Sequence, residues 1–173
     1  VGRVDLLDVN RAVSHYKADG LDLTPIFAAK DLDLSQNLRN TTVQDHELES
    51  HFDYPLIAQS ALALREGKPI VHNIEINNTN QAIGTMLGNE LTKRWGEQGL
   101  EPGTLTLNLR GSAGQSLGAF VPRGITITVE GDCNDYVGKG LSGGRIVVKP
   151  EANAGFVPEK NVIAGNVIGY GAT

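Results

Sequence analysis

The chain has 173 residues, of which 40% are apolar, and a formal net charge of −5. This length and composition indicate one domain with a sizeable core rather than a disordered chain. Its basic residues do not cluster, so neither nucleic acid nor an anionic membrane surface is expected as a partner, because both bind to basic patches.

The single cysteine, Cys133, cannot form a disulfide within the chain, and the sequence contains no apolar run that would span a membrane. Both features favour a cytoplasmic location. The chain begins at Val1 rather than at a methionine and stops at Thr173. We therefore expect it to be a fragment of a longer polypeptide.

The N-terminal region is predicted to be a connecting arm. Residues 1–50 mix short apolar pairs with aspartate, asparagine and threonine, and they show neither the period of a strand nor that of a helix. We assign residues 1–69 to this arm, which includes one helix near residues 54–66. Residues 70–173 are assigned to a second domain.

Two helices are predicted from their end signals and apolar spacing. For the helix near 54–66, Asp53 is a candidate N-cap, Pro55 falls in the first turn, and Gly67 follows the last turn. A second helix is expected from about residue 79 to 95, because apolar residues recur there at a spacing of four: Ile83, Leu87, Leu91 and Trp95.

The character of the sequence changes after Pro102. Residues 105–109 and 125–129 alternate apolar and polar side chains, as strands with one buried face do. A third short β-branched run, residues 145–149, is stopped by Pro150. Glycine turns separate these runs.

The glycines recur at fixed intervals. Further glycines stand 20 residues after Gly111, Gly118 and Gly124. Less regular copies of this glycine pattern occur upstream, at an offset of 34 residues, and downstream, after an insertion. The predicted structural repeat glycines are Gly84, Gly111, Gly118, Gly131, Gly138, Gly144 and Gly171.

A fixed period near 20 residues indicates a mainly β solenoid, in which each turn buries its apolar face against the next. The helix expected from about residue 79 to 95 would be an insertion of about fourteen residues between two turns. Glycines at equivalent positions would form corners, where φ is positive or where a side chain would strike the neighbouring turn. The inward residues would be Leu105, Leu107, Leu109, Ile125, Ile127, Val129, Ile146 and Val148.

One glycine group has the spacing of a dinucleotide-binding turn. Gly138, Gly140 and Gly143 form G-x-G-x-x-G, and Glu159 follows roughly where a ribose-binding acid would fall. That motif requires a strand before the glycines and a helix after them, because the helix N-terminus holds the pyrophosphate. Here a turn composition precedes the glycines and a β-branched run follows, so corner geometry is the preferred interpretation.

A second group matches the nucleophile elbow of hydrolases. Ser116 is the central residue of a G-x-S-x-G sequence that runs from residue 114 to 118. The elbow needs a helix after the serine, but Pro122 follows closely and Gly118 belongs to the repeat. We interpret Ser116 as a corner residue.

The titratable residues give no stronger site. His15, His46, His51 and His72 lack the i, i+3 or i, i+4 pairing typical of zinc ligands, so we interpret them as surface histidines. Asp132 and Asp135 with Lys139 suggest either an acid pair beside a cation or a turn with a salt bridge, and the turn is preferred. No catalytic, cofactor or metal site is predicted.

Three strings closely resemble the C-terminal GXGXG domain of the glutamate synthase large (α) subunit. They are GSAGQSLGAF at residues 111–120, GDCNDYVGKGLSGG at residues 131–144 and IAGNVIGYGAT at residues 163–173. The resemblance is strong over residues 71–173. Residues 1–7 resemble the segment that leaves the synthase domain in that family. Cys133, where the family usually has a small residue, is a mild departure.

The resemblance implies a right-handed parallel β-helix that serves as a scaffold in a multidomain enzyme making glutamate from glutamine and 2-oxoglutarate. In that family an amidotransferase domain releases ammonia, and a barrel domain carries FMN and a 3Fe–4S cluster. Neither domain lies in these residues. We therefore expect a structural, non-catalytic domain without a cofactor of its own, whose partners are the amidotransferase and FMN domains of the parent chain.

Two other interpretations stay open at this point. The chain could be a free-standing β-helix assembly subunit, like that of formylmethanofuran dehydrogenase, or, least favoured, an enzyme in its own right. A sequence that stops in mid-repeat at Thr173 favours the fragment. It also predicts self-association of the isolated chain through its C-terminal end, because exposed strand edges pair readily.

Overall fold

The computed structural model describes residues 6–7, 14–28 and 41–173. The chain divides into two compact units, Val1–His46 and Glu47–Thr173. In the first unit, the short helices α1 (Tyr16–Asp19) and α2 (Thr24–Phe27) bury no side chain. Residues 1–5, 8–13 and 29–40 of the predicted connecting arm lie outside the described residues, and the role of the arm stays a prediction.

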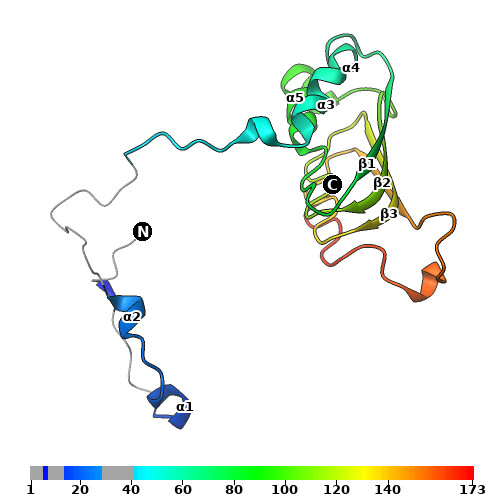
Figure 1. Cartoon of the computed structure of the whole chain (residues 1–173). Helices are drawn as coiled ribbons and strands as arrows, with labels where there is room; N and C mark the ends of the chain where they lie inside the picture. Colours follow the sequence, from blue (N-terminus) through cyan, green and yellow to red (C-terminus); the bar gives the residue numbers. More distant parts are fainter. Residues whose placement is uncertain (1–5, 8–13, 29–40) are drawn as a thin grey trace. The chain divides into compact units, whose positions relative to one another are not determined.

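The second unit begins with short helices (Figure 1). After the 3₁₀ turn η2 (Leu48–Ser50), the chain forms α3 (Asp53–Gln59) and α4 (Ala61–Glu66) where the sequence predicts one helix near 54–66. Ser60 separates the two helices, and α4 ends at Gly67, which has a left-handed φ of 66°.

The longest helix is α5 (Thr85–Trp95), followed by the 3₁₀ turn η3 (Gly96–Gln98). It starts later than the predicted residue 79, because residues 77–84 form turns and Gly84 adopts a left-handed φ of 90° at the N-cap. No helix within the described residues has the length and apolar character needed to cross a bilayer.

Four parallel strands form a sheet in the order β1-β2-β3-β4. They are β1 (Ile70–Ile76), β2 (Leu105–Ala113), β3 (Ile125–Cys133) and β4 (Arg145–Lys149). Leu105 pairs with Ile125, which confirms the 20-residue offset between the two strands predicted at residues 105–109 and 125–129. A last 3₁₀ turn, η4 (Pro158–Lys160), follows β4.

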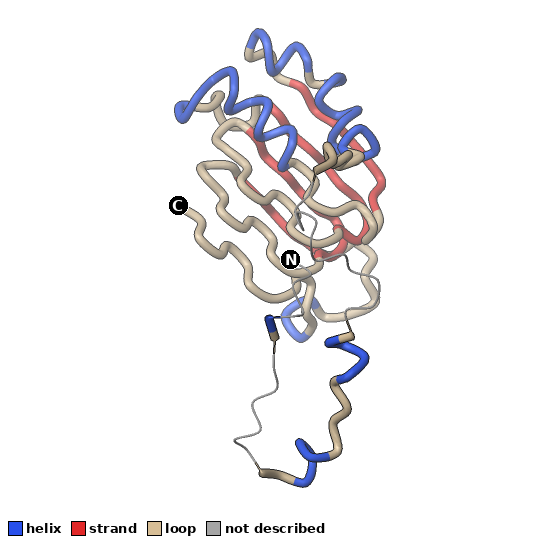
Figure 2. Tube along the Cα trace, turned by 90° about the vertical axis from the view of Figure 1, so that its left-hand side faces the viewer, coloured by secondary structure: helices blue, strands red, loops and turns tan. Residues whose placement is uncertain are grey.

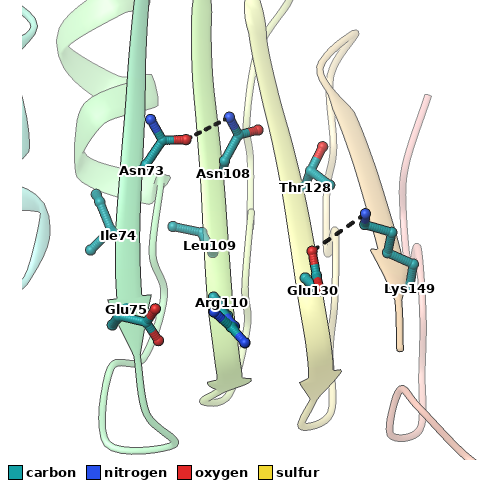
Figure 3. A pocket seen from close by; sticks show the side chains of 9 residues that line it. All are labelled: Asn73, Ile74, Glu75, Asn108, Leu109, Arg110, Thr128, Glu130 and Lys149. Carbon is teal, nitrogen blue, oxygen red and sulfur yellow. Dashed lines mark hydrogen bonds and ion pairs between the residues drawn. The ribbon is translucent and has the colours of Figure 1, made fainter. Parts of the chain in front are cut away.

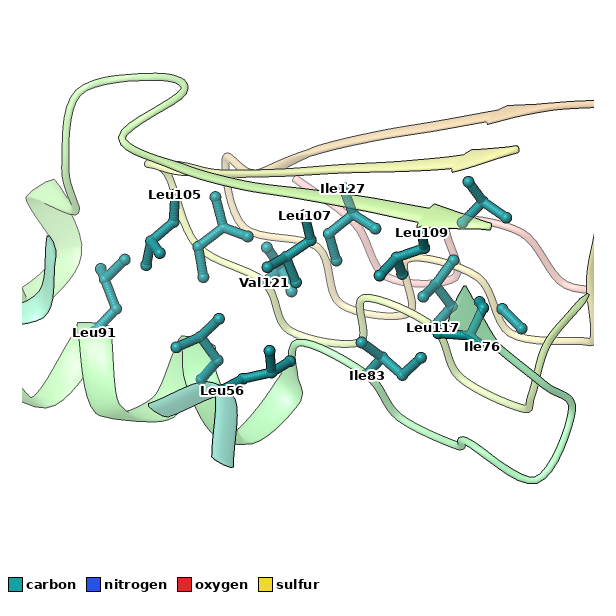
Figure 4. Close-up of a cluster of buried hydrophobic side chains, with 14 of the residues drawn as sticks. Leu56, Ile76, Ile83, Leu91, Leu105, Leu107, Leu109, Leu117, Val121 and Ile127 are labelled. Atoms are coloured by element: carbon teal, nitrogen blue, oxygen red, sulfur yellow. The ribbon is translucent and has the colours of Figure 1, made fainter. Parts of the chain in front are cut away.

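One face of the sheet is buried. Leu105, Leu107 and Leu109 of β2 are at most 2% exposed, and they point toward Leu91 of α5 and Leu117 of the following loop (Figure 4). Burying one such side chain stabilises the fold by about 2 to 3 kcal/mol. The predicted inward residues of β2 and β3 are thus core residues, whereas Ile146 and Val148 of β4 are partly buried at its edge.

The predicted mainly β solenoid, a right-handed β-helix, is wrong. The structure is a small α/β domain with a four-stranded parallel sheet, and α3, α4 and α5 supply buried residues to the same core. Leu87 and Leu91 of α5 are completely buried, so this helix is part of the core and not an excursion from it. The expectation failed because a regular glycine interval reports how neighbouring strands pair, but not what covers their inner face.

Candidate functional site

The glycine-rich segments form stacked loops beside the strands (Figure 2). We call loops 114–122, 134–142 and 165–172 the loop layer, and strands β1 to β4 the strand layer. A recurring hydrogen bond joins the loops, from a glycine N–H to the carbonyl of an adjacent turn: Gly118 to Ile83 (2.9 Å), Gly138 to Leu117 (2.8 Å) and Gly169 to Val137 (2.8 Å). Each loop is thereby tied to the turn before it.

Within the strand layer, Gly111 and Gly131 lie opposite each other near the ends of β2 and β3. Their φ angles are 119° and 148°, which few residues other than glycine adopt. A Cβ atom on Gly131 would collide with the carbonyl oxygen of Gly111, and a Cβ on Gly111 would collide with that of Ile76. Glycine is required here because the neighbouring backbone leaves no room.

Glycines of the loop layer and of the turn before it have different amounts of space: a Cβ atom on Gly118 would collide with Cδ1 of Ile146, and one on Gly114 with the carbonyl oxygen of Asn78. Gly84, Gly118 and Gly138 have φ angles of 90°, 64° and 65°. A Cβ atom on Gly138 would lie 3.4 Å from Cδ1 of Ile146, which is an ordinary contact. Glycine is favoured at this position by the left-handed backbone rather than by lack of space.

The last two predicted repeat glycines, Gly144 and Gly171, differ from the others in their surroundings. A Cβ atom on Gly144 would lie 2.9 Å from the carbonyl oxygen of Val121, so this glycine also marks a close approach. The strand register shifts by one residue at β4, where Thr126 pairs with Arg145. Gly171 has a φ of 68°, although Gly169 makes the recurring hydrogen bond.

Sequence reasoning missed a further regularity. Four residues with side chains adopt left-handed backbone angles two positions before a glycine of the loop layer or its equivalent: Ala82 (φ 50°), Ser116 (62°), Tyr136 (63°) and Val167 (59°). A left-handed residue other than glycine is uncommon. In the sequence, these four residues could have been found only by their position two residues before a glycine, because they share no residue type.

Ser116 does not have the surroundings of a nucleophile elbow. Its N–H donates to the carbonyl of Asp135 at 2.9 Å, and a turn rather than a helix follows it. Its side chain is only partly buried on a loop whose backbone is joined to the next loop. The geometry therefore fits a corner residue.

The candidate dinucleotide motif is likewise part of the loop layer. The N–H of Gly138 donates to Leu117 and that of Gly140 to Tyr170, both at 2.8 Å. These are the groups that would have to face a phosphate. Strand β4 begins at Arg145, directly after the glycines, and η4 contains Glu159 at a separate turn.

The acidic pair near Lys139 has a structural arrangement. Oδ1 of Asp135 accepts a hydrogen bond from the N–H of Asn166 at 2.7 Å, which ties two loops together, while Asp132 is exposed. Nζ of Lys139 lies 5.7 Å from the centre of the Tyr136 ring. The salt bridge considered for this turn is not among the ion pairs of the described residues.

Two of the four histidines accept hydrogen bonds from neighbouring backbone: Nδ1 of His15 from Lys17, and Nδ1 of His51 from Asp53. His46 is exposed. The described residues contain no group of three or more histidine, cysteine or acidic side chains placed to hold a metal ion.

His72 forms the arrangement most suggestive of catalysis. Its Nε2 lies 2.9 Å from Oγ of Ser60, and burial lowers the pKa of the imidazole. Ser60, however, is completely buried between α3 and α4. A substrate has no access to its hydroxyl, so the pair satisfies two polar groups at a helix junction.

Asp53 has a role that the sequence did not show. It was predicted to cap the helix that follows it, but its buried carboxylate accepts hydrogen bonds from the N–H groups of Gly84, Met86 and Leu87 at 2.9 to 3.1 Å. It therefore caps α5 from a distance. Burial raises the pKa of the Asp53 carboxyl, and the three N–H groups and the charge of His51 oppose that rise.

Cys133 is inert by environment. Its side chain is 6% exposed, and burial, with a smaller contribution from the charge of Asp132, raises the pKa of the thiol to about 12. Because the thiolate is the reactive form, this residue is not a candidate nucleophile.

A family model for the GXGXG motif matches residues 53–173, which contain both the strand layer and the loop layer. The chain belongs to the GXGXG motif family. The chain is 47% identical over its whole length to the NADH glutamate synthase of Schizosaccharomyces pombe. It is 45% identical, again over 100% of its length, to the NADPH glutamate synthase large chains of Bacillus subtilis and Azospirillum brasilense.

These matches confirm the resemblance to the GXGXG domain of glutamate synthase. The chain spans only a small part of the curated relatives that it matches, 8% of the Schizosaccharomyces protein and 11% of each bacterial large chain. The activity of those complete proteins therefore enters only as a proposal for this chain.

Proposed function

We propose that this GXGXG domain is a non-catalytic structural domain of a glutamate synthase, where it supports the spacing of the glutaminase and FMN/3Fe–4S synthase domains. The main support is that backbone N–H groups of the motif glycines form hydrogen bonds within the fold. Gly118, Gly138 and Gly140 all donate to carbonyls of adjacent turns, so the motif joins loops to one another.

The side-chain arrangement supports the same role. Two buried polar side chains have partners inside the fold, since Asp53 caps α5 and Ser60 pairs with His72, whereas the buried Oε1 of Gln115 has no hydrogen-bond partner among the described residues. Such satisfied groups are typical of a fixed framework. The residues that resemble catalytic ones take part in these structural contacts.

The proposal extends to cofactors and partners. We place FMN and the iron–sulfur cluster of the parent enzyme in its other domains, so this chain would hold neither group. Its partners would be the amidotransferase and FMN domains of the same polypeptide. A phosphate-binding loop would need amides facing outward, and here Gly138 and Gly140 use theirs between loops.

The decisive experiment uses a complete glutamate synthase that carries this domain. Ser116→Ala and Asp132→Asn should each leave the rate of glutamate formation within about twofold of the unaltered enzyme, because neither side chain would touch a reacting group. Gly131→Ala should instead reduce the yield of assembled enzyme, with glutamine hydrolysis no longer matched to glutamate formation.

Two outcomes would contradict the proposal. One is a loss of about a hundredfold or more in kcat for Ser116→Ala in a folded, FMN-loaded enzyme, since a loss of that size identifies a participant in the reaction. The other is a stoichiometric flavin spectrum in the isolated 173-residue chain after dialysis against FMN.

A further inference from the structure

The outer face of the sheet carries a row of four charged residues. Register places Glu75 of β1 beside Arg110 of β2, Arg110 beside Glu130 of β3, and Glu130 beside Lys149 of β4. We call these four residues the charge row. Figure 3 shows them along one side of a shallow hollow of about 420 Å³ that is lined by side chains of all four strands.

The charges alternate across the sheet. From β1 to β4 the row reads negative, positive, negative, positive, and Glu75, Arg110 and Lys149 are exposed. Nζ of Lys149 lies 3.5 Å from Oε2 of Glu130. A hydrogen bond from the N–H of Ala152, followed by the Lys149 charge, holds the pKa of Glu130 below its ordinary value, so Glu130 is ionised at neutral pH.

A row of this kind is complementary to itself when its order is reversed. A two-fold axis parallel to the strands turns the sheet over and reverses the order of its strands. Glu75 of one copy then faces Lys149 of the other, and Arg110 faces Glu130. All four facing pairs have opposite charge, whereas a row whose two outer charges or two inner charges shared a sign would place like charges together.

The neighbouring outward rows do not oppose this arrangement, and in the row of Ser112 and Asp132 on the other side of the charge row, Asp132 would face Ser112 of the other copy. The next row contains Asn73, Asn108, Thr128 and Val147, and it carries no charge. In the row beyond it, Arg145 is the single charged residue and would face Val71 of the other copy. The two-fold thus brings no like charges together on these rows.

We propose that this sheet face is a docking surface for a second copy of the chain, related by a two-fold axis parallel to the strands. Closed two-fold pairing is the commonest form of self-association. Four strands about 4.8 Å apart and about 20 Å long offer only a few hundred Å², less than the roughly 800 Å² per partner of a standard interface. The dimer is therefore weak and reversible, and charge pairing sets its orientation.

Sedimentation of the 173-residue chain over a range of concentrations tests this. A monomer–dimer equilibrium is expected at low salt, weakened at least about tenfold between 20 mM and 500 mM NaCl, because salt screens exposed charges. Glu75→Lys and Lys149→Glu should each raise the dimer Kd by about tenfold or more, since each places two pairs of like charges face to face.

An equimolar mixture of the two variants gives the sharpest result. In a mixed dimer, residue 75 of one chain again faces an opposite charge at residue 149 of the other, and the remaining pairs are unchanged. The mixture should therefore regain the affinity of the unaltered chain, although neither variant self-associates well. Glu66→Lys and Lys68→Glu, an exposed ion pair away from this face, are matched controls and should leave the Kd unchanged.

Three results would overturn the proposal. They are a chain that stays monomeric at every concentration, a dimer that neither charge reversal weakens, and a mixture that does not regain affinity. Loss of association in Ile168→Lys, with no effect of the two charge reversals, would assign self-association to the C-terminal loop instead. Circular dichroism of each variant confirms that it is folded.

Discussion

Gly131 of the strand layer and Gly138 of the loop layer are both favoured as glycine, but for different reasons. At the strand ends, a side chain on Gly131 would run into the backbone of Gly111. In the loops, Gly138 has ordinary space around it and is favoured only by its left-handed φ of 65°. Ser116 and Tyr136 adopt similar backbone angles nearby with full side chains. Lack of space is therefore a stricter requirement than backbone conformation.

The strictest test of this difference is Gly131→Ala. The added methyl group combines a disfavoured φ with a collision against a backbone carbonyl that is held in the sheet. We expect a loss of about 3 kcal/mol or more in the free energy of unfolding. Urea unfolding measures it, and a loss below about 1 kcal/mol would show that the strand ends shift easily.

The second test concerns α5, which covers the inner face of the sheet beside the loop layer. Asp53→Asn keeps the shape of the side chain but replaces one acceptor oxygen with a donor that faces backbone N–H groups. Because a buried unsatisfied group costs about 1 to 3 kcal/mol, we expect a loss near the middle of that range. Hydrogen exchange at Met86 and Leu87 should accelerate.

A matched control for this change is Asp22→Asn. Asp22 accepts a hydrogen bond from the N–H of Thr24 in an exposed turn of the first unit. Its replacement should change stability by less than about 0.5 kcal/mol. Equal effects at the two aspartates would mean that Asp53 does not hold the start of α5.

Gly138→Ala separates backbone conformation from space. Here the methyl group meets only an ordinary contact, so the expected loss is that of a left-handed alanine, about 1 kcal/mol. The comparison with Gly131→Ala under the same conditions decides the point. Losses of equal size would remove the distinction between these two positions.

The inner face of the strand layer also predicts a dependence on pH. Burial lowers the pKa of His72, so the folded chain binds a proton less readily than the unfolded chain does. The contribution of neutral His72 is present above its ordinary pKa of about 6.5 and is lost as the pH falls below that value. Unfolding measured between pH 7.5 and 5.5 should show this, and His72→Gln should reduce the slope.

The smallest effect is expected at Ser116→Gly. Glycine removes the strain of a left-handed residue with a side chain, which stabilises the folded state, but it also has more conformational freedom in the unfolded chain. These two effects nearly cancel, so the free energy of unfolding should change by no more than about 0.5 kcal/mol. A destabilisation above about 1 kcal/mol would show that the serine side chain contributes to the loop layer in its own right.

Much of the strand layer could be predicted from local sequence. The alternation at residues 105–109 and 125–129 and their equal spacing from glycines give the pairing of Leu105 with Ile125. The end of α4 at Gly67 could also be predicted, because glycine readily adopts the left-handed conformation that ends a helix. These signals are carried by residues close together in the chain.

The remaining features depend on residues far apart in the chain. The carboxylate of Asp53 reaches amides more than thirty residues away, and the hydroxyl of Ser60 meets His72 of β1. No period or motif encodes such contacts, so the sequence suggested a capping residue for the wrong helix and a surface histidine where a partly buried one lies.

By itself, the sequence determined the membership of the GXGXG family, the glycine interval and the strands that pair across it, because alternation and spacing are properties of the chain. Only the tertiary structure decided that helices complete the core, that Gly131 faces a carbonyl, and that four charges alternate across one face. Each of these depends on which surfaces meet, and that is settled by packing rather than by local pattern.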